Sequence, residues 1–148
     1  MMSQIFVSGH KSPDTDSIAA ALSYSYLKRR LGMDAVAVRA GEINKESRFA
    51  LDYFNLEEPM LVTSVTRKNP EDEKQKVILV DHNESKQTID GMDDAEVLEI
   101  IDHHRFGDFE SENPIFILVR PVGCVNTVIY GLYLSLIHIS EPTRHLRI

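Results

Sequence analysis

The amino-acid sequence of this 148-residue chain predicts an α/β domain: a doubly wound, mainly parallel sheet with helices on both faces. Three observations predict this fold. Short, uniformly apolar runs recur along the chain, as in strands that are buried on both sides. Segments with helical spacing of apolar residues separate several of these runs, which is the order that parallel strands require. Hydrophobic residues make up 43% of the chain and charged residues 26%, an ordinary composition for one globular domain.

The first half of the chain contains two strand–helix pairs. Residues 4–8 form an apolar run and predict the first buried strand. Residues 15–31 carry apolar side chains three and four positions apart, which predicts a helix that ends at Gly32. Residues 35–38 predict the second strand, and residues 46–54 predict the second helix. Five aromatic residues fall at helical spacing in these two helices, and we expect them in the core: Tyr24, Tyr26, Phe49, Tyr53 and Phe54.

The second half begins with a charged segment and continues with three strands. Residues 67–76 are mostly charged and predict a solvent-exposed loop. Further apolar runs predict three buried strands, at residues 77–80, 97–101 and 115–119. Pro121 and Gly123 then precede a short helical pattern from about residue 126 to residue 133.

Charge, apolar run length and cysteine content argue against several classes of protein, namely nucleic-acid-coating, membrane and secreted proteins. The chain has 16 Lys+Arg against 23 Asp+Glu, a formal net charge of −7, which argues against a protein that coats nucleic acid. Its apolar runs are far shorter than a membrane-spanning helix, and its N-terminus lacks a signal-peptide pattern. With Cys124 as the single cysteine, it cannot form an internal disulfide. We therefore expect a cytoplasmic protein with no nucleic-acid or membrane partner.

Three of the predicted strands are each followed by aspartate and histidine. The clusters are His10, Asp14 and Asp16 after the first strand, Asp81 and His82 after residues 77–80, and Asp102, His103 and His104 after residues 97–101. The carboxyl ends of parallel strands share one edge of a sheet, and ligands bind there. We therefore expect these side chains to converge in one site.

The donor types indicate the kind of ion that this site would hold. Imidazole nitrogens and carboxylate oxygens, without thiolates, suit Mn²⁺, Mg²⁺ or Co²⁺ rather than a structural zinc ion. The donors are too many for one open catalytic ion, and two ions about 3.5–4 Å apart would account for them. Two divalent ions would also neutralise the four carboxylates, which are Asp14, Asp16, Asp81 and Asp102.

Each cluster by itself also has an ordinary structural interpretation. Asp14 or Asp16 could cap the helix that follows, and Asp81 could be a strand-end residue. His103 and His104 could be surface side chains. These separate explanations do not account for the presence of all three clusters at strand carboxyl ends, so we predict joint metal binding.

Residues 123–124 allow two interpretations. A glycine before a helix could form a phosphate-binding turn, because free amides at a helix start attract anions, or it could be a plain structural turn. Cys124 has no identifiable basic partner that would activate it as a nucleophile. We therefore expect Cys124 to be a small buried residue.

The three clusters together resemble the signature of the DHH phosphoesterase superfamily. The segments are GHKSPDTDS at residues 9–17, VDHNE at residues 80–84 and IDHHR at residues 101–105. Within the superfamily they are most similar to the manganese-dependent (family II) inorganic pyrophosphatases, as are residues 39–46, 50–54 and 121–124. Thr15 favours the pyrophosphatases, because the oligonucleotide-cleaving relatives usually carry glycine there. The resemblance covers residues 3 to about 134.

The resemblance implies hydrolysis of inorganic pyrophosphate to two phosphates by a bridging hydroxide that two metal ions activate. It implies Mn²⁺ as the ion, with Co²⁺ or Mg²⁺ as alternatives. The implied metal ligands are His10 and Asp14 for one ion, Asp16 and His103 for the other, and Asp81 for both. His104 would be the catalytic residue that contacts phosphate, and Asp102 and His82 would orient their neighbours.

Members of that family are considerably longer, with a further aspartate ligand and a second domain that supplies basic residues. We therefore expect this chain to be an inactive N-terminal fragment of a homodimeric enzyme. Residues 1–134 would be the phosphoesterase domain, and residues 135–148, which resemble translated adapter sequence, would be foreign to it. Two other functions stay open: another DHH phosphoesterase acting on polyphosphate, a short oligonucleotide or a cyclic dinucleotide, or a metal-binding or dimerisation module without catalysis.

Overall fold

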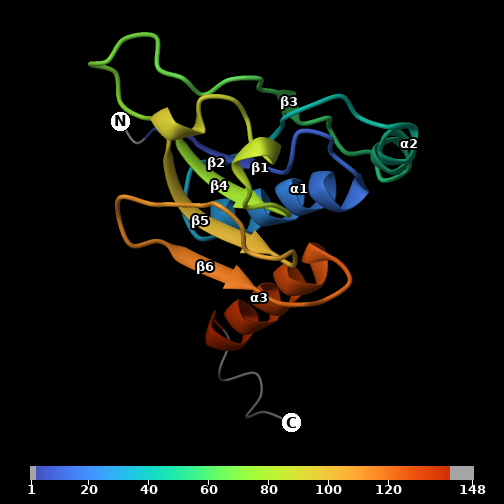
Figure 1. Ribbon diagram of the computed structural model, residues 1–148. Helices are drawn as coiled ribbons and strands as arrows, with labels where there is room; N and C mark the ends of the chain where they lie inside the picture. The colour runs from blue at the N-terminus through green and yellow to red at the C-terminus, as the bar shows by residue number, and fades with distance from the viewer. Residues whose placement is uncertain (1–2, 141–148) are drawn as a thin grey trace.

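A six-stranded parallel sheet organises the chain (Figure 1). The computed structural model describes residues 3–140. The strands are β1 (Ile5–Ser8), β2 (Ala35–Arg39), β3 (Met60–Leu61), β4 (Lys76–Val80), β5 (Glu96–Asp102) and β6 (Phe116–Val119). Their order across the sheet is β3-β2-β1-β4-β5-β6, and every neighbouring pair is parallel. The predicted α/β class is therefore confirmed, with β3 as an edge strand that the sequence did not predict.

The three α-helices lie close to the predicted segments, whereas two 3₁₀ helices lie where the sequence predicts no helix. They are the α-helices α1 (Thr15–Arg30), α2 (Lys45–Tyr53) and α3 (Val125–Ser140) and the 3₁₀ helices η1 (Ser85–Gln87) and η2 (Met92–Asp94). Within residues 3–140, no helix is long and apolar enough to cross a membrane. Helix α3 continues past the domain boundary predicted at residue 134, and residues 141–148 of the predicted foreign tail lie outside the described residues.

The strand order reverses between β1 and β4. From β1 the chain builds the sheet outward through β2 and β3, and it then returns to add β4, β5 and β6 on the other side. Strands β1 and β4 pair in parallel, from Ile5 opposite Lys76 to Ser8 opposite Leu79. Their carboxyl ends therefore lie side by side at the switch point, where sheets of this kind bind ligands.

Helices α1 and α3 cover one face of the sheet, where the larger hydrophobic core forms (Figure 1). Glu99 of β5 holds α1 in place, because it accepts a hydrogen bond from Tyr24 and pairs with Lys28. The opposite face is covered by loops, with Ile89 and Met92 among the side chains that pack there. Helical cover on that face is limited to short 3₁₀ turns, because the segments after β4 and β5 lack a helical period of apolar residues.

Four of the five aromatic residues expected in the core are exposed. Tyr24 is buried, whereas Tyr26, Phe49, Tyr53 and Phe54 have exposed side chains. Helix α2 buries only Ser47 and Leu51, and the rings of Phe49 and Tyr53 stack on each other. Helical spacing correctly gathers these aromatics on one face, but spacing does not show whether another element packs against that face.

Candidate metal centre

Asp81 lies at the middle of the candidate site. It directly follows β4, and its backbone adopts a left-handed conformation with φ +63°, which is uncommon for a residue with a side chain. Its carboxylate is 1% exposed. Oδ1 lies 2.9 Å from Nε2 of His103, and Oδ2 lies 3.3 Å from Nε2 of His10. One buried carboxylate thus meets histidines from two other strand ends.

His103 follows β5, and a hydrogen bond on the side away from Asp81 fixes the orientation of its ring. Nδ1 lies 2.8 Å from the carbonyl oxygen of Val122, and a carbonyl only accepts, so Nδ1 carries the proton. Nε2 is left to face Asp81 and lies 3.6 Å from Oδ2 of Asp16. This tautomer, with a backbone carbonyl on the far nitrogen, is the usual arrangement of a metal-binding histidine.

His10 and Asp14 belong to the loop between β1 and α1. Nε2 of His10 lies 3.7 Å from Oδ1 of Asp14, four residues on. Asp14 is also the N-cap of α1, where Oδ1 accepts a hydrogen bond from the backbone N–H of Ser17 at 2.9 Å. Asp14 thus caps α1 while its carboxylate also lies near His10, so the capping role does not exclude a role in the candidate site.

Asp16 reaches from α1 to the first turn of α3. Its carboxylate accepts hydrogen bonds from the backbone N–H groups of Val125, at 2.9 Å, and Asn126, at 3.3 Å. The Asn126 side-chain amide donates to the same carboxylate and to the Asp16 carbonyl. The backbone amides at the start of α3 thus bind the Asp16 carboxylate, in the position where a phosphate-binding turn would bind its anion. Cys124 beside it is partly buried, with Sγ 3.3 Å from Oγ1 of Thr127.

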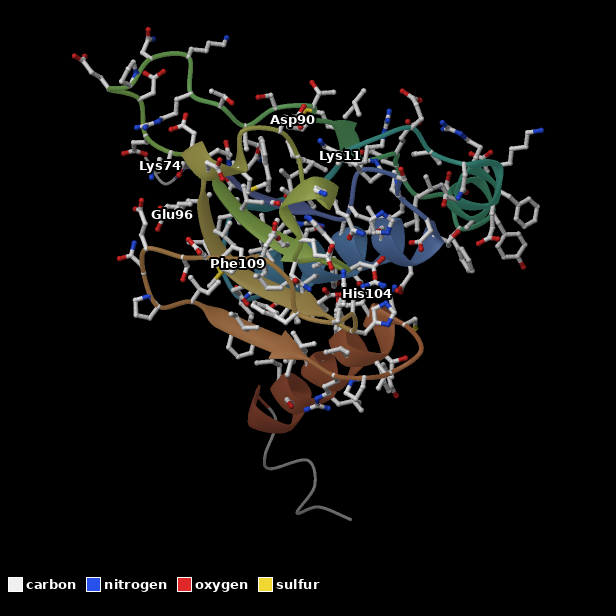
Figure 2. All side chains as sticks on the ribbon, viewed as in Figure 1. Lys11, Lys74, Asp90, Glu96, His104 and Phe109 are labelled. Carbon is white, nitrogen blue, oxygen red and sulfur yellow. The ribbon has the colours of Figure 1, made fainter. Side chains whose placement is uncertain are left out.

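Asp102 fixes the turn that contains His103 and His104 by hydrogen bonds. It is fully buried, and Oδ1 accepts hydrogen bonds from the backbone N–H groups of His103 and His104. The same oxygen lies 2.8 Å from Nδ1 of His104, while Oδ2 accepts from Asn83. His104 itself is 51% exposed. Figure 2 shows His104 beyond the carboxyl end of β5, whereas Lys74 and Glu96 lie near its opposite end.

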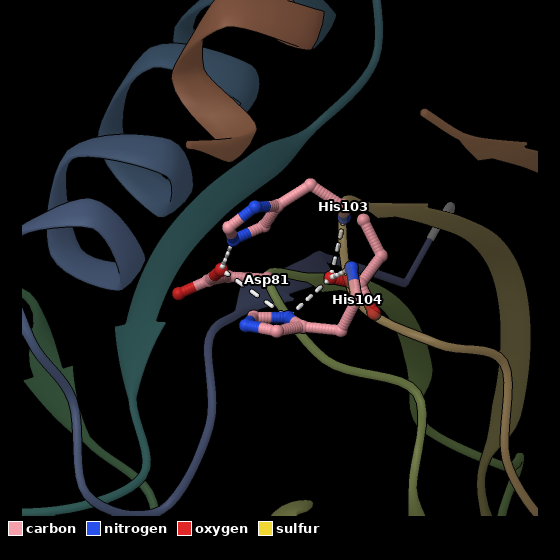
Figure 3. Close-up of side chains that lie close together, drawn as sticks. Asp81, His103 and His104 are labelled. Atoms are coloured by element: carbon pink, nitrogen blue, oxygen red, sulfur yellow. Dashed lines mark hydrogen bonds and ion pairs between the residues drawn. The ribbon is translucent and has the colours of Figure 1, made fainter. Parts of the chain in front are cut away.

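Two groups of ligand atoms share Asp81. In each group all the atoms lie within 4.8 Å of one another: the first is His10, Asp14 and Asp81, and the second is Asp81, Asp102, His103 and His104. Figure 3 shows the Asp81 carboxylate between the rings of His103 and His104. Asp16 belongs to neither group, although it approaches His103. Oxygen and imidazole donors around a buried carboxylate fit divalent ions such as Mn²⁺.

Charge at the centre shifts the pKa values of Asp81 and of the two rings that face it. Contact with Asp81 raises the pKa of His10 above its ordinary value, against the opposing effect of burial. Burial opposes a charge on His103 too, but the Val122 carbonyl and the Asp81 carboxylate outweigh it and raise its pKa. Burial alone would raise the pKa of Asp81, yet hydrogen bonds from His10 and Ser17 lower it. The Asp81 carboxylate thus favours the protonated form of both rings, and the rings favour the ionised form of Asp81.

His82 faces the interior and behaves differently. It is 1% exposed, Nδ1 donates to the Val80 carbonyl at 2.9 Å, and Nε2 has no hydrogen-bond partner among the described residues. Its ring stands edge-on to that of His10, with centroids 6.5 Å apart. Burial lowers the pKa of His82 to about 4, so the ring is neutral near pH 7.

We expect His82 to make the metal-free chain less stable in mild acid. Unfolding restores its pKa from about 4 to the ordinary 6.5, so the unfolded state binds the extra proton between these values. Stability should therefore fall as the pH drops from 6.5 towards 4, by about 3 kcal/mol in total at about 1.4 kcal/mol per pKa unit. Urea unfolding in the presence of a chelator, at several pH values, measures this loss.

The neighbouring histidines His10 and His103 do not contribute to the loss of stability between pH 6.5 and 4. Because the pKa values of His10 and His103 are raised, their contribution is complete below pH 6.5 and is lost as the pH rises above it. The lowered pKa of Asp81 acts only below its ordinary value of 3.8. His82→Phe should flatten the slope between pH 6.5 and 4.5, and an unchanged slope in that variant would contradict the assignment.

Sequence reasoning did not find three groups that hold the site together: the hydroxyl of Ser17, the side chain of Asn126 and the carbonyl of Val122. Asn126 lies 110 residues from Asp16, and the Val122 carbonyl lies 19 residues from His103. A serine, an asparagine and a backbone carbonyl carry no recognisable spacing. Only the packing of α1, α3 and β5 brings them to the site.

Comparison with known proteins identifies the family of this chain. Residues 4–146 match the profile of the DHH family, N-terminal domain. A "Probable manganese-dependent inorganic pyrophosphatase" of Exiguobacterium sp. is 49% identical over 132 residues, and one of Bacillus licheniformis is also 49% identical over 132 residues. Each alignment covers 89% of this chain and 41% of the relative, so the chain spans less than half the length of these proteins.

Solved structures show the same fold. A Methanococcus jannaschii protein described as a "putative family II inorganic pyrophosphatase" superposes with a TM-score of 0.78 and 38% identity, over 89% of this chain and 39% of that one. An exopolyphosphatase-related protein from Bacteroides fragilis superposes with a TM-score of 0.63 at 16% identity, over 94% of this chain and 41% of that one, which shows a shared fold. With its Asp/His clusters joined at one sheet edge and the family profile matched over residues 4–146, this chain belongs to the DHH family, N-terminal domain.

Proposed function

We propose that this chain is the metal-binding part of a manganese-dependent inorganic pyrophosphatase, which hydrolyses pyrophosphate to two phosphates. The observation that carries the proposal is the position of Asp81, whose buried carboxylate belongs to both groups of ligand atoms. The manganese dependence and the reaction in the names of the relatives support it. The homodimer, the cytoplasmic location and the lack of nucleic-acid substrates stay predictions from the sequence.

The residues present fit two divalent ions. His10 and Asp14 would hold one ion, His103 and Asp16 the other, and Asp81 would bind both. Such ions lower the pKa of a nearby water and offset the negative charge of the phosphoryl oxygens. Asp16 would serve its ion while still accepting hydrogen bonds from α3, because each carboxylate oxygen has two lone pairs.

His104 and its surroundings would bind the substrate. Asp102 fixes Nδ1 of His104, which leaves Nε2 of this half-exposed ring to meet a phosphoryl oxygen. A cavity of about 370 Å³ lies beside it, lined by His82, Asn83, Glu84, Gln87, His104 and Arg105. Positioning and charge stabilisation dominate phosphoryl transfer, so a fixed donor beside such a cavity suits this reaction.

A chimeric protein tests the proposal. Residues 1–134 of this chain would be joined to the part of the B. licheniformis relative that follows its matching region. We expect Mn²⁺-dependent release of phosphate from pyrophosphate, with much slower reaction of tripolyphosphate, a dinucleotide and a cyclic dinucleotide. Preference for a nucleotide diester would contradict the proposal in favour of another DHH phosphoesterase. Mn²⁺ binding without any turnover would favour a non-catalytic module.

The 148-residue chain itself provides a second measurement. Calorimetric titration should show Mn²⁺ binding, whereas a phosphate-release assay should show little or no turnover. A chimera that folds and works would also support residues 1–134 as the phosphoesterase domain. Robust turnover by the 148-residue chain would instead show that no further residues are needed.

A further inference from the structure

Ser17 touches two of the acidic clusters at once. It lies in the first turn of α1 and is 1% exposed. Its hydroxyl donates a 2.8 Å hydrogen bond to Oδ2 of Asp81, and its backbone N–H donates to Oδ1 of Asp14. A residue outside the predicted ligand set therefore links the carboxylates that follow β1 and β4.

The direction of the hydroxyl bond is fixed by its acceptor. A carboxylate only accepts, so the Ser17 hydroxyl proton points at Asp81. With Oδ2 held on the side of Ser17 and His10, Oδ1 is left to face His103. Rotation of this carboxylate would break contacts on both sides, and a buried oxygen that loses its donor is costly.

Gly9 keeps the space that this contact needs. A Cβ atom at position 9 would lie 2.7 Å from both Cβ and Oγ of Ser17, closer than such atoms approach. Any side chain there would displace Ser17 from its present position beside Asp81. The end of β1 therefore contributes to the site through a missing side chain as well as through His10.

We infer that Ser17 is a positioning residue whose hydroxyl turns the Asp81 carboxylate so that one oxygen faces each group of ligands. The inference rests on the proposed two-ion site. Ser17 acts through Asp81, because its hydroxyl donates to that carboxylate. Gly9 supports the same contact, because the absence of a side chain there leaves room for Ser17 beside Asp81.

Titration with Mn²⁺ alone, on the 148-residue chain, tests the inference. Ser17→Ala should weaken Mn²⁺ binding about 10- to 100-fold, the range for residues that support metal ligands. Ser25→Ala is the matched control, since Ser25 is equally buried in α1 but its hydroxyl donates only to the Leu22 carbonyl. Ser17→Thr keeps the hydroxyl and should retain most of the affinity. Unchanged affinity in Ser17→Ala, or equal losses in the Ser17→Ala and Ser25→Ala variants, would overturn the inference.

Gly9→Ala gives an independent check, because it alters no polar group. It should weaken Mn²⁺ binding in the same direction as Ser17→Ala, and circular dichroism would verify that the variant folds. Wild-type affinity in a folded Gly9→Ala variant would contradict the role given to the close approach.

A double-mutant cycle separates this inference from the proposed function. If the unaltered chain binds no Mn²⁺, the proposed function fails. Urea unfolding of Ser17→Ala, Asp81→Ala and the double variant then measures the contact without metal. We expect coupling of about fivefold or more in the unfolding equilibrium constant, and none between Ser25 and Asp81. Absence of coupling between Ser17 and Asp81 would overturn the inference by itself.

Discussion

Replacing Asp81 by asparagine is expected to abolish measurable Mn²⁺ binding by the chain and phosphate release by the chimera. Asp81 is the one residue in both groups of ligand atoms, and its buried carboxylate carries the negative charge between His10 and His103. An amide keeps the size but loses the charge, so the loss should exceed the roughly 100-fold limit for supporting residues. Calorimetric titration with Mn²⁺ measures it.

The choice of asparagine separates two effects. Asp81 has a left-handed backbone, which asparagine tolerates and alanine does not, so Asp81→Ala would add backbone strain to the loss of a ligand. Asp108→Ala is the charge-matched control, because Asp108 accepts hydrogen bonds from Ser85 outside the candidate site. Mn²⁺ affinity within tenfold of wild type in a folded Asp81→Asn variant would remove Asp81 from the ligands.

His104→Ala should separate metal binding from turnover. We expect the variant chimera to bind Mn²⁺ almost normally and to release phosphate about 10²–10⁴ times more slowly, the usual range for a positioned acid, base or donor. The physical reason is that His104 is half exposed and is fixed by Asp102, whereas His103 faces the buried carboxylate directly. Titration and a phosphate-release assay on the same preparation measure both quantities.

The geometry also defines the result that would contradict this role. Nδ1 of His104 lies 3.7 Å from Oδ1 of Asp81, and His104 belongs to the second group of ligand atoms. Loss of an ion in His104→Ala would place His104 among the metal ligands. A variant with unchanged turnover would show that it does not meet the substrate.

The sequence predicts that the site residues converge, because the ends of the strands can be located from the apolar runs. Apolar runs locate β1, β4 and β5, and parallel strands bring Asp81 and His103 to one edge whatever the details of packing. It does not predict that Asp16 caps α3, because Val125 and Asn126 contact it across 109 and 110 residues of chain.

The spacing of apolar residues in a helix likewise does not predict which helix faces are buried. The period of apolar residues in α2 correctly gathers Phe49 and Tyr53 on one side, but exposure depends on what lies opposite. The face of the sheet over β4 is another example, since Ile89, in a loop, and Met92, in the short helix η2, pack there without following a period. Local patterns therefore locate elements and strand ends, while pairings between distant elements require the fold.

The hydrogen bonds from α3 to Asp16 have a consequence for the order of events during synthesis. His10, Asp14 and Asp81 leave the ribosome well before residue 125, but Asp16 gains its partners only when the amides of α3 emerge. The candidate centre therefore reaches its final arrangement only after α3 has docked, and under the proposed function a nascent chain would gain its full affinity for ions only then.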